Sequence, residues 1–273
     1  MKYEGYIFKI KARQPEFDKA FKSYKERTEG HGIVLPQIAK KFNQSFQEFE
    51  SLLKNKTGGN DSTDFRSSLS KMANINSYIK DNFGLIEDLY ALRNVFSHRM
   101  RGEYVADIKE IALTEINKII NSIKIPRIVI QEFGKEVYTA DEDQLIRCVV
   151  EKMKQKTYTH TPVYSKEGKC LGVFAYSSLF EWLADKLNNE TNMEIIFDKI
   201  YMRDINKKYL NSPSVNFDWV SETKSIYEII PQFEYAVNSS KRLDCLLITK
   251  NGKCNEKISG IITSYDLPSI KNK

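Results

Sequence analysis

The second half of this 273-residue chain repeats one order of predicted elements twice, over about 60 residues each time. In each copy a helix precedes two strands joined by a tight turn, and another helix follows. Gly-Val-Phe at 172–174 in the first copy corresponds to Gly-Ile-Ile at 260–262 in the second. The four strands are expected at residues 161–164, 171–174, 243–249 and 258–263. Such a repeat indicates two copies of one supersecondary unit.

The repeated unit resembles the CBS domain, a β-α-β-β-α unit that occurs in tandem pairs. We assign residues 125–190 to the first CBS copy and residues 191–273 to the second. The ligand motif of the family is Gly, two apolar residues, Thr or Ser, two further residues and Asp. The second copy has it intact as Gly260-Ile-Ile-Thr263-Ser-Tyr-Asp266, whereas the first has Ala175 and Ser178 at the Thr and Asp positions.

The resemblance implies an adenine nucleotide (AMP, ADP or an ATP-like ligand) bound by the second copy. A carboxylate such as Asp266 can accept hydrogen bonds from both ribose hydroxyls, while the Thr263 hydroxyl and helix amides can hold a phosphate. A basic residue often faces the phosphate in this family, and Arg242 and His160 are the candidates. The competing interpretation makes Asp266 a helix N-cap and Thr263 a strand-end residue.

Residues 1–124 differ in character, since their apolar residues recur at helical spacing. The predicted helices cover about residues 15–26, 35–54, 62–82, 85–101 and 105–120. Pro126 marks the boundary to the repeated region. The expected fold class is therefore α+β multidomain, with an N-terminal all-α bundle over residues 1–124 followed by the CBS pair.

The fourth predicted helix contains Arg93-Asn94-Val95-Phe96-Ser97-His98. Residues of an ideal helix are rotated by about 100° each, so Asn94 and His98 share a face and Arg93 lies one step away. An imidazole can transfer protons near neutral pH, and an arginine can hold a phosphate. The same three residues at helical spacing are also common as solvated or capping side chains, with Val95 and Phe96 in the core.

The hexapeptide resembles the motif of HEPN domains, which are all-helical. Many HEPN proteins are metal-independent ribonucleases that act as dimers, and others bind nucleotides or partners without catalysis. The resemblance implies that His98 transfers the proton, Arg93 clamps the phosphate and Asn94 orients them.

The charge distribution agrees in sign with a nucleic-acid partner. Residues 1–124 carry 21 Lys and Arg against 16 Asp and Glu, a net of +5, and residues 125–273 carry 21 against 20, a net of +1. A solvated surface explains an excess of this size equally well. No apolar run approaches the roughly 20 residues of a membrane span.

The four cysteines lack metal-like spacing, which predicts reduced thiols in a cytoplasmic protein without a metal site.

Two hypotheses follow for the whole chain. The first is a nucleotide-regulated, metal-independent endoribonuclease acting on RNA, in which the CBS pair is the sensor. The second is a non-catalytic nucleotide sensor whose helical domain binds a protein or RNA partner. Both include a homodimer with contacts in both domains, because both resemblances are to modules that pair with themselves.

Overall fold

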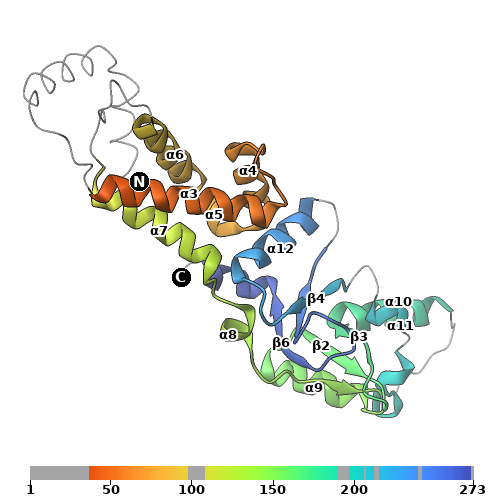
Figure 1. The fold of residues 1–273 in the computed structure, drawn as a ribbon. Helices are drawn as coiled ribbons and strands as arrows, with labels where there is room; N and C mark the ends of the chain where they lie inside the picture. The colour runs from red at the N-terminus through yellow and green to blue at the C-terminus, as the bar shows by residue number, and fades with distance from the viewer. Residues whose placement is uncertain are drawn as a thin grey trace, which may run out of the picture. The chain divides into compact units, whose positions relative to one another are not determined.

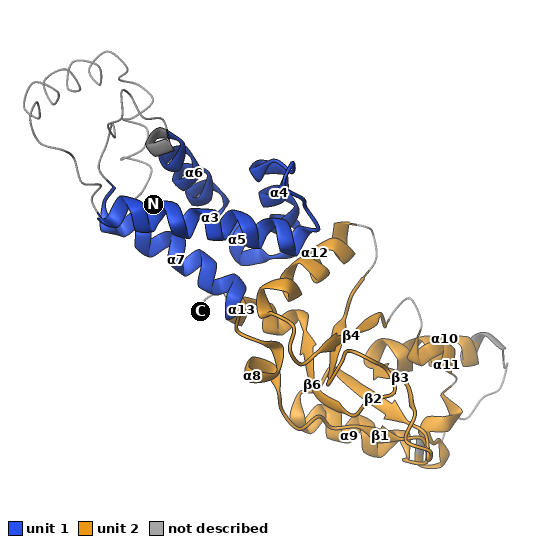
Figure 2. Ribbon diagram, in the orientation of Figure 1, with its two compact units in different colours: residues 1–125 blue, residues 126–273 orange. Residues whose placement is uncertain are grey.

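The computed structural model describes residues 37–97, 108–189, 197–205, 207–211, 215–238 and 242–271. The chain divides into two compact units, Met1–Ile125 and Pro126–Lys273 (Figures 1 and 2). The helix predicted at 15–26 and the residue His98 lie outside the described residues, as does the start of the helix predicted at 105–120.

The described part of the first unit consists of helices. Their bounds are α3 Gln37–Thr57, α4 Phe65–Ile75, α5 Ser77–Asp81, α6 Phe83–Ser97 and α7 Glu110–Lys124. Helices α3 and α7 lie side by side (Figure 1). The predicted all-helical N-terminal region is thus confirmed for the described residues.

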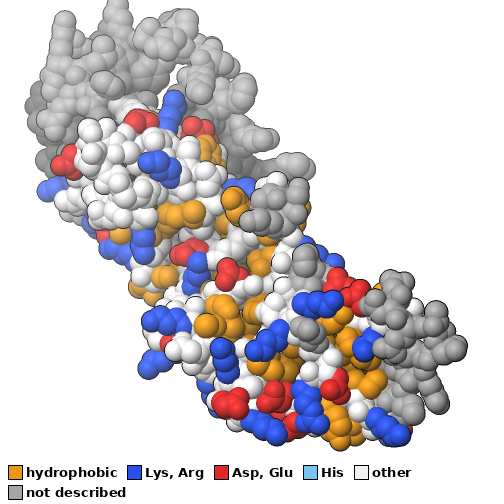
Figure 3. All heavy atoms as spheres, turned by 90° about the vertical axis from the view of Figure 1, so that its right-hand side faces the viewer, with side chains coloured by type: hydrophobic (Ala, Val, Ile, Leu, Met, Phe, Trp, Pro, Cys, Tyr) orange, Lys and Arg blue, Asp and Glu red, His pale blue; other side chains and the backbone are white. Residues whose placement is uncertain are grey.

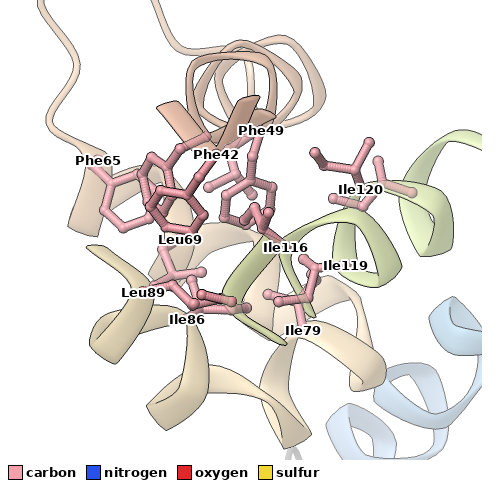
Figure 4. Packing of buried hydrophobic residues seen from close by; sticks show 14 of the residues in the cluster. Phe42, Phe49, Phe65, Leu69, Ile79, Ile86, Leu89, Ile116, Ile119 and Ile120 are labelled. Carbon is pink, nitrogen blue, oxygen red and sulfur yellow. The ribbon is translucent and has the colours of Figure 1, made fainter. Parts of the chain in front are cut away.

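The core of the first unit is built on one face of α3. Phe42, Phe46, Phe49 and Leu53 recur at intervals of three or four residues and are fully buried. The ring of Phe46 lies 5.4 Å from the ring of Phe65 in α4, centroid to centroid. Figure 4 shows these rings packing against isoleucines of α5, α6 and α7. This single cluster holds α6 in place.

One predicted helix, over residues 62–82, is two helices in the structure. Asp64 caps α4, since its carboxylate accepts hydrogen bonds from the amides of Arg66 and Ser67. Asn76 then adopts an extended conformation (φ −140°, ψ 111°) and its side chain caps α5 by accepting from the Ile79 amide at 3.1 Å. The prediction of one continuous helix was wrong because apolar spacing does not report a mid-helix cap.

The second unit contains two three-stranded sheets of the same topology. Their strands are β1 Ala140–Asp141, β2 His160–Tyr164, β3 Cys170–Ala175, β4 Phe217–Ser221, β5 Cys245–Thr249 and β6 Ile258–Thr263. In each sheet the first strand is parallel to the middle strand and the third is antiparallel to it. The two copies inferred from the sequence therefore have one architecture, and the α+β prediction is confirmed.

Helices flank the strands in matching order. The first copy has α9 Ile146–Lys156 and α10 Tyr176–Asn189, and the second has η3 Ile226–Glu228, α12 Ile229–Asn238, η4 Ser264–Asp266 and α13 Leu267–Lys271. Short helices precede each copy or join the two, namely α8 Val129–Phe133, η1 Phe197–Lys199, η2 Met202–Asp204 and α11 Lys207–Leu210. None of the described helices is long and apolar enough to cross a bilayer.

The register of the strands aligns the two copies residue by residue. Gly172 pairs with Val163 and Gly260 with Ile248, and the register shifts immediately after these pairs in both sheets. A Cβ on Gly172 would lie 2.6 Å from the carbonyl oxygen of Leu210. A Cβ on Gly260 would meet a backbone carbonyl at 2.5 Å in the same way, so both glycines are required by close backbone approach.

The two sheets pack against each other through a shared cluster. Val173 and Ala175 of β3 lie in one buried group with Cys245 and Leu247 of β5. Because side chains alternate along a strand, these residues all belong to the inner faces of the sheets. The start of β2 and the end of β3 in the first copy thereby approach the start of β5 in the second.

Candidate functional site

One end of the second sheet brings three loop junctions together. Phe217, Cys245 and Thr263 form a row across β4, β5 and β6. The residues just before β4 and β5 and just after β6 therefore lie at the same edge. We refer to this edge, with Asn216, Arg242, Asp244, Thr263 and Asp266, as the second sheet end.

Thr263 and Asp266 contact each other at the start of η4. The Asp266 Oδ2 atom accepts hydrogen bonds from the Thr263 backbone amide at 2.7 Å and from the Thr263 hydroxyl at 2.9 Å. Thr263 is the N-cap of η4 and Asp266 is the third residue of its capping box, so Asp266 helps to cap the helix but is not itself the N-cap that the competing interpretation expected. Both of these bonds engage Oδ2, so the other carboxylate oxygen, Oδ1, is in position for an additional donor. Capping therefore holds the carboxylate in place without using its full hydrogen-bonding capacity.

Arg242 and Asp244 form an ion pair at the same edge. Asp244 is 6% exposed, and it also accepts from the Asn216 amide at 3.0 Å while its own amide donates to the Asn216 carbonyl at 2.7 Å. The sequence prediction included Arg242 but missed Asp244. The signal in the sequence that could have indicated Asp244 is its position, since this acidic residue directly precedes the buried strand β5.

His160 lies at the start of β2 in the first copy. Its Nδ1 atom is 2.8 Å from the Thr159 hydroxyl. Burial lowers the pKa of His160, while the charge of Asp244 raises that pKa and the charge of Arg242 lowers it. The two predicted basic residues therefore lie near one another, on either side of the contact between the copies. His160 pairs with Ala175 in the first sheet, and Cys245 pairs with Thr263 at the same place in the second sheet. The residue equivalent to His160 is therefore Cys245, and His160 and Arg242 do not hold equivalent positions.

Comparison with known families identifies part of this unit. Residues 130–185 match the family model described as "CBS domain". These residues form a CBS domain. With the second copy of the same topology, the C-terminal unit has the organisation of a CBS pair. The matched residues lie wholly within this unit, so the match leaves the helical unit unassigned.

Solved structures of CBS proteins resemble the chain at low identity. The CBS-domain containing protein ATU1752 from Agrobacterium tumefaciens is 15% identical and has a TM-score of 0.37, with coverage of 52% of this chain and 89% of that one. The CBS domain pair of protein MJ0100, in complex with 5′-methylthioadenosine and S-adenosyl-L-methionine, is 15% identical with a TM-score of 0.34, covering 54% and 97%. CBSX2 in complex with AMP is 15% identical with a TM-score of 0.35, covering 53% and 96%. No curated protein matches the sequence.

In the first CBS copy, an uncharged serine occupies the position that corresponds to Asp266. The Ser178 hydroxyl accepts a hydrogen bond from the Ala175 amide at 3.2 Å, in the place where Asp266 accepts from Thr263. Ser178 is fully buried. The serine therefore satisfies the capping requirement but offers neither a charge nor an exposed acceptor to a ligand.

The predicted catalytic residues of the helical unit lie on α6. Arg93 donates to the Asn94 side-chain oxygen at 3.2 Å and contacts the Glu50 carboxylate of α3 at 3.4 Å. The side chains of Arg93 and Glu50 are both about one quarter exposed. The structure thus places Arg93 beside Asn94, whereas His98 lies outside the described residues. The sequence prediction missed Glu50, because no local pattern marks a contact over 43 residues.

Potential metal ligands and thiols show no site in the described part of the chain. A search of its His, Cys, Asp and Glu side chains finds no group of three that could hold a metal ion. All four cysteines are free, and burial raises the pKa of the Cys245 and Cys170 thiols.

Proposed function

We propose that the chain is a nucleotide-sensing regulatory protein whose CBS pair binds an adenine nucleotide at the second sheet end. The observation that carries the proposal is the Asp266 carboxylate, which Thr263 holds at the same sheet end as the Arg242 cation. A fixed carboxylate suits the two ribose hydroxyls, and a guanidinium suits a phosphate. The adenine base is proposed from the CBS resemblance, and the cytoplasm is the proposed compartment.

The proposal also assigns unequal roles to the two copies. The second copy has Thr263 and Asp266, whereas Ala175 and the buried Ser178 replace them in the first. A ligand that needs a carboxylate therefore finds one competent site in each chain.

Mass spectrometry of the nucleotides released from purified protein tests this function directly. We expect an adenine nucleotide that rebinds to the stripped protein. Release of a different nucleotide, or the absence of any nucleotide together with no rebinding of AMP, ADP or ATP, would reject the proposal.

Metal-independent cleavage of RNA by the helical unit is the second candidate function. The contact between Arg93 and Asn94 favours it, because two of the three motif side chains already lie together on α6. The ion pair with Glu50 opposes it, since a scissile phosphate would have to compete for Arg93. Over the described residues on the face in Figure 3, Lys and Arg are interspersed with Asp and Glu rather than gathered in one basic patch. A helical unit that binds a protein or RNA partner without cleaving is therefore the main proposal.

We further propose that the protein is a homodimer. Helix α10 exposes Tyr176, Phe180 and Leu187, whose spacing of four and seven residues places them on one helical face, with Phe180 70% and Leu187 65% exposed. Light scattering at micromolar concentration should report twice the 31.7 kDa chain mass. Phe180→Glu should shift the protein toward monomer, and Ile75→Glu on α4 should not. A wild-type monomer would contradict the proposal.

A further inference from the structure

Asp244 is a nearly buried carboxylate at the second sheet end. It holds Arg242 in an ion pair while its other oxygen, Oδ2, accepts from the Asn216 amide. Arg242 itself is mostly exposed, with 68% of its side chain accessible. The buried partner is therefore fixed and the exposed partner can reorient, so a bound anion would compete with Asp244 for Arg242.

The described charges at this edge do not favour a strongly anionic ligand. The described acidic side chains of the second sheet end are Asp244 and Asp266, and its described basic side chain, besides the imidazole of His160 nearby, is Arg242. The charges of Asp244 and Arg242 both act on His160, but burial has the largest effect, lowers its pKa and favours its neutral form. Among the described residues of this edge, two carboxylates thus stand against one guanidinium, although a phosphate needs positive charge.

We infer that Asp244 limits the negative charge that a ligand of this site can carry, by neutralising Arg242. The inference rests on the proposed adenine-nucleotide site and names its ligand class. The preferred ligands are adenosine compounds with a neutral or cationic 5′ substituent or with one phosphate, and a triphosphate is disfavoured. The carboxylate of Asp266 selects the ribose, and Asp244 selects against phosphate charge.

The test compares adenosine, AMP and ATP by calorimetry on the full chain and on Asp244→Asn. The carboxamide oxygen can still accept from the Asn216 amide, so the substitution removes the charge and keeps the local bond. We expect the ratio of AMP affinity to adenosine affinity to rise by roughly tenfold, and the ATP ratio by more, because one repulsive charge has gone and Arg242 is released. Glu151→Gln is the matched control, since Glu151 also pairs with an arginine, Arg147, but on α9 of the first copy. Its ratios should stay at the wild-type values.

A second variant keeps the test independent of the stability of Asp244→Asn. Arg242→Gln alters an exposed side chain and should lower the AMP to adenosine ratio several-fold while adenosine still binds. Unchanged ratios in both variants would overturn the role of Asp244 and leave the nucleotide site standing. Failure of the wild type to bind any of the three ligands would overturn the proposed function as well, so the two failures can be told apart.

Discussion

Replacing Asp266 with alanine should weaken AMP binding by roughly 10- to 150-fold, or ~1.5–3 kcal/mol, the scale of hydrogen bonds to a charged group. The carboxylate that would accept from the ribose hydroxyls is lost. Because Asp266 also caps η4 through the Thr263 amide, alanine removes a structural bond too. Asp266→Asn separates the effects, since the carboxamide retains an oxygen for the cap but loses the charge. Isothermal calorimetry on both variants, with melting curves as a check of folding, measures the change.

Ser178 provides the matched control in the first CBS copy. Ser178→Ala removes the hydrogen bond from the Ala175 amide and should cost about 1 kcal/mol of stability. It should leave AMP affinity within about twofold of wild type, because the buried hydroxyl faces no ligand. If Ser178→Ala abolished binding and Asp266→Ala did not, the live site would have to be reassigned to the first copy.

If the helical unit cleaves RNA, His98→Ala should reduce the rate by ~100- to 10,000-fold, the typical contribution of general acid–base catalysis. Arg93→Ala should cause comparable loss, because the guanidinium would oppose charge building on the phosphate. Asn94→Ala should be milder, since water can partly replace an orienting side chain. The assay incubates labelled single-stranded RNA with each variant, with and without adenine nucleotide.

Several controls give this assay a clear outcome. EDTA should leave cleavage unchanged, and a DNA oligonucleotide of the same sequence should stay intact because it lacks the 2′-hydroxyl nucleophile. Equal cleavage by wild type and His98→Ala would indicate a contaminating nuclease. The absence of cleavage under every ligand condition would reject the catalytic candidate and retain the sensor.

The features that the sequence predicted well depend on local pattern. The repeat in the second unit could be recognised because Gly172 and Gly260 are each followed by two apolar residues, and the strand register matches them. The Asp64 cap is local in the same sense, since its hydrogen bonds reach residues two and three positions ahead.

The features that the sequence prediction missed depend on contacts between distant residues. Asp244 belongs to the site because it forms hydrogen bonds with Asn216, which is 28 residues away. Glu50 contacts Arg93, which lies on another helix. Neither contact leaves a periodic signature. The break at Asn76 was missed for a different reason, because the apolar spacing continues across it and the side-chain cap decides.

The proposed function places one competent adenine-nucleotide site in each chain, at the second sheet end. Calorimetric titration of the nucleotide-free full chain with AMP tests it most directly, because the stoichiometry and the affinity come from one experiment. We expect one AMP per chain, and an affinity that is weaker by roughly 10- to 150-fold in Asp266→Ala. Two equivalent AMP molecules per chain, or no heat of binding for AMP, adenosine and ATP alike, would contradict it.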